Sequence, residues 1–166
     1  PIVQFILQPI LIAGVLFHFI MGFYLEIQNR KAAKYEYQKE KGSANSTWMS
    51  RNMITSGLVI LAFLVLHFID FWVPEMNHKY IEFLPEDPNR YFKHLVHKFE
   101  NPLRVAMYCL AFVLLALHLL HGFTSSLRSM GTNKSYVASA KTAGIIYSIG
   151  IPLGFCIIAI FHYLNQ

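Results

Sequence analysis

The feature that most constrains this chain is a set of four long apolar runs, at residues 2–27, 53–73, 103–127 and 143–164, separated by blocks of charge. A helix needs about 20 apolar residues to cross the hydrocarbon core of a bilayer. Backbone in that core must satisfy its hydrogen bonds within the segment, which favours helices. The runs are apolar on all sides, unlike the amphipathic helices of soluble proteins. We therefore expect an all-α membrane protein, with residues 1–166 forming a single transmembrane helix bundle of four spans.

The loop charges predict the orientation of these spans. The loop after the first run carries six basic and two acidic residues, and the loop after the third run carries three basic residues and no acid. The loop after the second run balances five basic against five acidic residues. The positive-inside rule places the first two of these loops on the cytoplasmic side and the balanced loop outside. The net charge of +5 is thus explained by topology, and we expect no nucleic-acid partner.

This orientation places Pro1 on the outer side, directly ahead of an inward-running span. Neither an initiator Met nor a cationic leader region precedes that span. We therefore expect one further outward-running helix ahead of Pro1 in the native protein, giving five spans.

Two histidines are predicted at matching depth in the membrane. His18 and His118 each follow the outer end of an inward-running span by some fifteen residues, or about 22 Å at the helical rise. A low-spin b-type haem needs two imidazoles that face each other across the iron. Gly22 and Gly122 follow these histidines by one turn, where a flat macrocycle could approach the backbone. The pattern favours a haem held by His18 and His118, although glycines also serve helix packing and a membrane histidine can simply hydrogen-bond a neighbour.

Other polar residues of the spans have more open interpretations. His67 is expected about 10 Å from the outer surface, too shallow to share the iron of the deeper pair. It could ligate a second haem with a partner from a helix ahead of Pro1. Asp70, one turn further on, is either a proton carrier beside that site or an interface residue at the helix end. His121 could contact a haem propionate or water, or could simply pack.

The outer loop contains a stretch with mixed apolar and basic positions at helical spacing, at residues 91–99. We expect a short helix in the membrane interface there. His94 and His97 lie on it without an accompanying carboxylate or thiol at useful spacing. A solvated histidine pair is therefore favoured over a metal site.

Three segments carry a family resemblance: Leu25-Glu26-Ile27-Gln28-Asn29-Arg30, Asn45-Ser46-Thr47-Trp48-Met49-Ser50-Arg51-Asn52 and His118-Leu119-Leu120-His121-Gly122-Phe123. The chain resembles the cytochrome b subunit of the diheme succinate dehydrogenase and fumarate reductase family over essentially its whole length. The match is to that family's second to fifth helices. The resemblance implies a proximal haem on His18 and His118, each in His-x-x-x-Gly, and a distal haem on His67 with a histidine from the family's first helix.

The resemblance further implies an electron conduit that does no chemistry on a dicarboxylate itself. A flavoprotein and an iron-sulfur subunit would dock on the cytoplasmic face of a bacterial inner membrane, and electrons would pass through two b haems to or from a quinone. Asp70 is the candidate at the quinone site. Arg51 and Arg128, at inner helix ends, could pair with propionates of the proximal haem or could serve only as topology-setting charges.

Several alternatives remain open at this point. Other diheme b cytochromes, such as b561-like reductases or the membrane subunit of a nitrate reductase, share the chemistry. A proton or ion transporter could use His18, His67 and His118 as a relay without haem. A structural anchor with vestigial histidines would also fit. The sequence does not separate succinate oxidation from fumarate reduction, and it leaves open the quinone, proton coupling and dimerisation.

Overall fold

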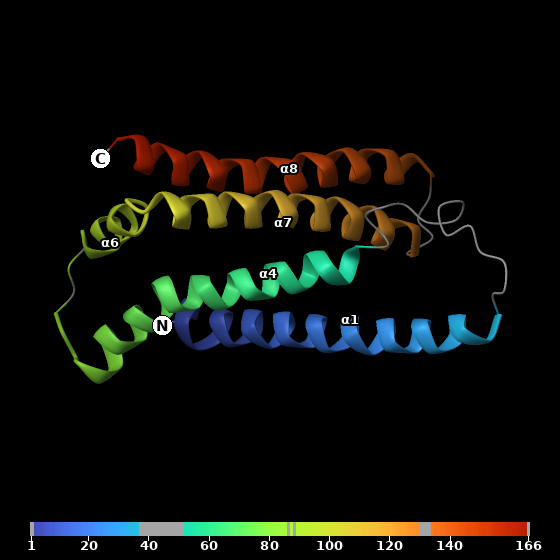
Figure 1. Ribbon diagram of the computed structural model, residues 1–166, viewed down its shortest axis with the longest axis horizontal. Helices are drawn as coiled ribbons and strands as arrows, with labels where there is room; N and C mark the ends of the chain where they lie inside the picture. The colour runs from blue at the N-terminus through green and yellow to red at the C-terminus, as the bar shows by residue number, and fades with distance from the viewer. Residues whose placement is uncertain (1, 37–51, 86, 88, 130–133, 166) are drawn as a thin grey trace. The chain divides into compact units, whose positions relative to one another are not determined.

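The fold is all-α, as the apolar runs predicted. A computed structural model describes residues 2–36, 52–85, 87, 89–129 and 134–165, and within these ranges the backbone is almost entirely helical, with no β-strand (Figure 1). Four segments are long and apolar enough to cross a membrane: Val3–Ala32, Met53–Ile81, Pro102–Leu127 and Val137–Leu164. The prediction of four transmembrane helices is confirmed.

The chain divides into two compact units, Pro1–Gly57 and Leu58–Gln166. The first contains α1 (Gln8–Glu36), which continues from a π-helical turn, η1 (Val3–Leu7), and the beginning of α4. The second contains the rest of α4 (Met53–His67), η2 (Phe68–Trp72), α5 (Val73–Met76), η3 (Asn77–Ile81), α6 (Arg90–Lys98), α7 (Pro102–Ser129) and α8 (Lys134–Leu164).

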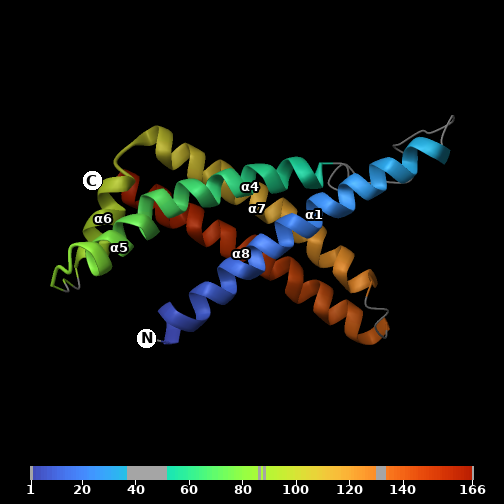
Figure 2. The same cartoon turned by 90° about the horizontal axis from the view of Figure 1, so that it is seen from below.

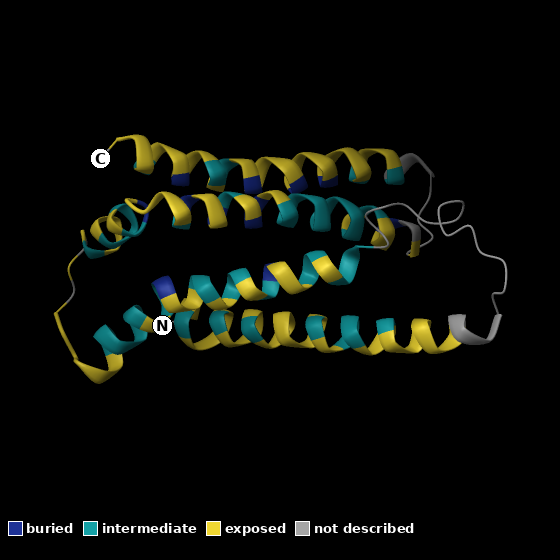
Figure 3. Cartoon of the chain, viewed as in Figure 1, coloured by how far each residue is buried: buried dark blue, intermediate teal, exposed yellow. Residues whose placement is uncertain are grey.

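Helices α7 and α8 lie antiparallel and side by side, and their buried residues face each other (Figures 1 and 3). The ring of Phe112 stacks on Phe155 with centroids 5.4 Å apart. Nearer the α7–α8 connection, Gly144 faces the ring of Phe123, and a Cβ atom at this position would overlap that ring. The missing side chain at Gly144 therefore allows the two helices to approach closely.

The core of the second unit is aromatic and surrounds Tyr108, which is 2% exposed. Its buried members are Phe99, Val105, Tyr108, Phe112 and Ala159, packed by Phe63, Leu66, Phe71, Leu95, Cys109 and Cys156. The ring of Phe63 meets Tyr108 edge-on at 5.0 Å and Phe112 at 5.3 Å, which joins α4 to α7. Large apolar side chains elsewhere are mostly exposed, as expected for surfaces that contact lipid.

Two helix ends differ from the expected runs. The second span was expected to end at residue 73, before Pro74, but the helix continues to Ile81. A π turn, η2, ends two residues before Pro74 and widens the hydrogen-bond ladder there, and the helix continues past the proline. Helix α8 begins at Lys134, well before the apolar run at 143–164. Polar residues extend both helices beyond their apolar parts.

Candidate functional site

A buried carboxylate organises one end of the second unit. Asp70 is only 1% exposed. Its Oδ1 accepts hydrogen bonds from the Arg104 guanidinium and from Nζ of Lys98 at 3.3 Å, while the Tyr108 hydroxyl donates to Oδ2 at 3.0 Å. These four residues form what we call the Asp70 cluster. It joins the C-terminal part of the second span to α6 and α7, and it places two cations around one carboxylate.

The backbone carbonyl of Asp70 has a partner of its own. Pro74 has no N–H and cannot donate to the carbonyl four residues before it, which is that of Asp70. Nε2 of His94, on α6, lies 2.6 Å from this carbonyl oxygen. Since a carbonyl only accepts, Nε2 carries the proton in this bond. His94 is also half-buried against the ring of Phe71, at 5.7 Å. The expectation of a solvated His94 was therefore wrong. His97 is exposed as expected, but its Nδ1 lies 3.1 Å from Oε2 of Glu100, so the expectation of no accompanying carboxylate was wrong.

A second carboxylate connects the beginning of α6 to α5, and these two helices lie at the same end of the second unit (Figure 2). Glu75 bonds Nζ of Lys79 at 2.7 Å, the Arg90 guanidinium, and the Tyr91 hydroxyl at 2.7 Å. Partial burial lowers the pKa of Arg90, but the hydrogen bonds and the charge interactions with Glu75 and Tyr91 together outweigh it, so the pKa is raised. The segment between the second and third spans is thus fixed to the second span at two points.

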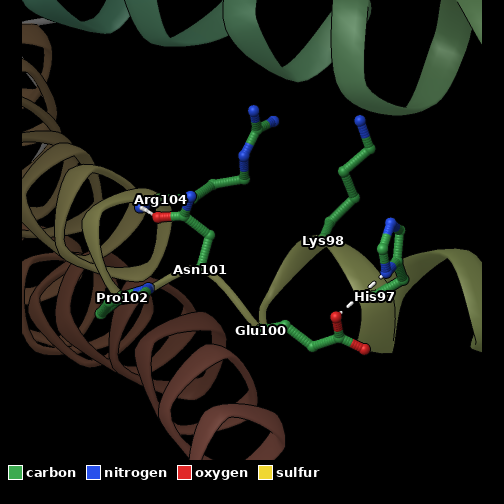
Figure 4. A pocket seen from close by; sticks show the side chains of 6 residues that line it. All are labelled: His97, Lys98, Glu100, Asn101, Pro102 and Arg104. Atoms are coloured by element: carbon green, nitrogen blue, oxygen red, sulfur yellow. Dashed lines mark hydrogen bonds and ion pairs between the residues drawn. The ribbon is translucent and has the colours of Figure 1, made fainter.

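A shallow pocket opens beside the Asp70 cluster, between α6 and the beginning of α7 (Figure 4). It is lined by His97, Lys98, Glu100, Asn101, Pro102 and Arg104. Asn101 caps α7, since its Oδ1 accepts the backbone N–H groups of Leu103 at 2.9 Å and Arg104 at 3.2 Å. Pro102 occupies the first helical position, where its missing N–H costs nothing. This cap fixes the start of α7 and thereby the base of the Arg104 side chain.

His67 lies between two phenylalanines of its own helix face. Its ring is 6.0 Å from Phe63 and 5.2 Å from Phe71, each about one turn away, and it is half-buried. Asp70 follows by three residues on the same side of the helix. The predicted haem ligand and the predicted quinone residue therefore share one aromatic environment.

His67 and His118 lie at different levels of the second unit. Phe63, one turn before His67, packs on Phe112. His118 is six residues beyond Phe112 on α7, in the direction away from the Asp70 cluster. His67 lies about 6 Å from Phe63 toward the Asp70 cluster, and His118 lies about 9 Å from Phe112 in the opposite direction. The two histidines are therefore about 15 Å apart along the helices. They do not share one metal site.

The predicted proximal residues lie in separate units. His118, His121 and Gly122 are half-buried on α7 in the second unit. His18 lies on α1 in the first unit, exposed, with its ring 6.1 Å from that of Phe19. A Cβ atom at Gly22 would meet no atom within 4 Å in the described part of the chain. The pairing of His18 with His118 stays a prediction.

Two arginines predicted near the proximal haem are not described at the side-chain level. Arg51 lies outside the described residues. For Arg128 the description covers only the backbone, which belongs to α7. Whether these arginines pair with propionates of the proximal haem or serve only as topology-setting charges stays a prediction.

The partners of Asp70 were not predicted from the sequence. Lys98 and Arg104 were counted only as loop charges, and Tyr108 was not singled out. The available signal was that Asp70 lies near the end of one apolar run and Arg104 near the beginning of the next, where opposite charges can pair. Among the described residues, no group of three or more His, Cys, Asp or Glu side chains could hold a metal ion directly.

Searches with this chain against known protein families, curated proteins and solved structures gave no match. Fold and site together define a polytopic α-helical membrane protein with at least one histidine in each of the four described spans. Any finer assignment depends on the residues themselves.

Proposed function

We propose that this chain is a membrane anchor that binds b-type haem and carries electrons between an iron-sulfur subunit and a membrane quinone, as in succinate:quinone oxidoreductases. The observation that carries the proposal is a repeated one. His18 with Gly22 on α1, and His118 with Gly122 on α7, each lie inside an uninterrupted helix of spanning length. A histidine followed one turn later by a glycine places an iron ligand and a position without a side chain on one helix face. A flat macrocycle can come close to the backbone at that glycine.

The residues present are compatible with a haem. A Cβ atom at Gly22 would meet no described atom within 4 Å, and His18, one turn before it, is exposed. His118 and Gly122 are half-buried, in keeping with a site against the second unit. Haem, when bound, would supply a one-electron carrier, and the protein's part is to orient the imidazoles and exclude water.

A second haem is proposed at His67. Its separation of about 15 Å from His118 along the helices suits two distinct carriers in series. Phe63 and Phe71 would keep water from the ring of His67. Asp70 stays the candidate residue at a quinone site near the haem proposed at His67. Because its carboxylate already accepts bonds from Lys98, Arg104 and Tyr108, one of these bonds would have to open before Asp70 could move a proton.

The proposed partners follow from the loop charges and the family resemblance. The basic loops would face the cytoplasm of a bacterium and dock a flavoprotein and an iron-sulfur subunit, whose own active site would act on succinate or fumarate. Complexes of this kind could also form dimers.

The test is a reduced-minus-oxidised optical spectrum of the purified native complex, with haem quantified as the pyridine haemochrome. We expect two b haems per chain, together with co-purifying flavin and iron-sulfur clusters. Haem without flavin would favour a different diheme cytochrome. The absence of a Soret band would contradict the proposal and favour a histidine-relay transporter or a structural anchor.

A further inference from the structure

A buried hydroxyl in α8 is left without a partner. Ser148 is 1% exposed, and its Oγ has no hydrogen-bond partner among the residues that the structure describes. Ser148 lies sixteen residues before the end of α8 at Leu164, or about 24 Å along the helix. Leaving a polar group unbonded in a protein interior costs about 1–3 kcal/mol. We therefore expect the hydroxyl of Ser148 to have a hydrogen-bond partner.

The backbone at Ser148 is affected by a proline in the same helix. Pro152 lies inside α8 and is fully buried. Because proline has no N–H, the carbonyl of Ser148, four residues earlier, loses its α-helical donor. Hydroxyl and carbonyl of one residue thus both need a hydrogen bond.

The other two prolines inside spans are accommodated differently. Pro9 follows the π turn η1, and Pro74 follows the π turn η2, in each case by two residues. At Pro74 the side chain of His94 also donates to the carbonyl four residues before the proline. Helix α8, in contrast, is α-helical from Lys134 to Leu164, without a π turn at Pro152. The rearrangement found at the other prolines is missing here.

The position of Ser148 faces α7. Gly144, Ser148 and Pro152 recur at every fourth residue and are all buried, so they form one narrow face of small residues. Gly144 meets Phe123. One turn further along each helix, Ser148 is level with Leu119, the neighbour of His118. The two polar groups are enclosed between helices and do not face lipid.

We infer that Ser148 binds a single water molecule, which donates to its carbonyl and bonds its hydroxyl between α7 and α8. Buried waters in proteins satisfy polar groups of this kind, and ordered water is a known partner for the carbonyl that a proline leaves free in a membrane helix. The site goes beyond the proposed function and does not depend on haem. The bound water would hold α8 in a single conformation at Pro152. It would also lie at the level of the helical turn of α7 that contains His118.

The first test is a high-resolution structure of the full-length protein in lipid nanodiscs, as wild type, Ser148→Ala and Pro152→Ala. We expect density for one water within hydrogen-bond distance of Oγ and O of Ser148 in the wild type, and none in either variant. In the Pro152→Ala variant, the backbone N–H of residue 152 would donate to the carbonyl of Ser148 in place of the water. A wild-type structure in which Oγ instead bonds a protein group, with no water, would overturn the inference.

A thermal-unfolding cycle provides a second test. Ser148→Ala is expected to lower Tm in the wild type and to change it little in the Pro152→Ala background, since the water is already lost there. Pro9→Ala, at a proline preceded by a π turn, is the matched control background, in which the full effect of Ser148→Ala should remain. An equal shift of Tm in all three backgrounds would contradict a shared water.

Discussion

The Tyr108 hydroxyl donates a hydrogen bond to Oδ2 of Asp70 at 3.0 Å, and both side chains are almost fully buried. This bond connects the second span to α7, thirty-eight residues later in the chain. The tyrosine ring belongs to the aromatic core, while its hydroxyl completes the Asp70 cluster. The same side chain thus joins apolar packing to the charged network.

We predict that Asp70→Asn destabilises the protein much more than Tyr108→Phe. The asparagine leaves Lys98 and Arg104 without their carboxylate, and breaking a buried pair from one side costs about 3–5 kcal/mol. The phenylalanine keeps the ring and loses one hydrogen bond, at about 1–2 kcal/mol. Thermal unfolding of both variants in detergent measures the difference. Equal effects would mean that the ion pairs contribute nothing beyond the tyrosine bond.

A second prediction concerns the close approach of α7 and α8. Gly144→Ala would push a Cβ atom into the ring of Phe123, and overpacking of this kind costs about 1–3 kcal/mol. Gly150→Ala is the matched control on the same helix, because a Cβ there meets no described atom within 4 Å. The control should be neutral, or stabilising by up to about 1 kcal/mol through helix propensity. Comparable stability of the two variants would show that α7 and α8 do not meet at Gly144.

The third prediction tests the donor to the Asp70 carbonyl. His94→Ala removes it and should cost about 1–2 kcal/mol, whereas His94→Gln, which keeps an N–H donor, should cost less. His97→Ala, on the exposed side of α6, should leave the melting temperature almost unchanged. If both histidines were equally dispensable, His94 would not hold α6 to the second span.

The sequence was sufficient to predict the four spanning helices, because an apolar run of that length has few alternatives in a bilayer. It did not predict where the second helix ends. The π turn ahead of Pro74 is a backbone adjustment without a residue pattern of its own. The apolar run therefore seemed to end at the proline.

The Asp70 cluster could be predicted only in part. The apolar run singled out Asp70 as a buried polar residue, but its partners lie 28 to 38 residues away, beyond an irregular loop and a short helix. Local periodicity carries no information about such distances. His94 was misassigned for the same reason, because its partner is the backbone carbonyl of Asp70, twenty-four residues earlier in the chain.

The most direct test of the central claim is the haem content of the full-length complex with His18→Ala, compared with wild type and with His97→Ala as a control outside the spans. Pyridine haemochrome quantification should give two b haems for the wild type and the control, and one for His18→Ala. Two haems in all three proteins would contradict His18 as an axial ligand. No haem in the wild type would contradict the haem-carrying anchor itself.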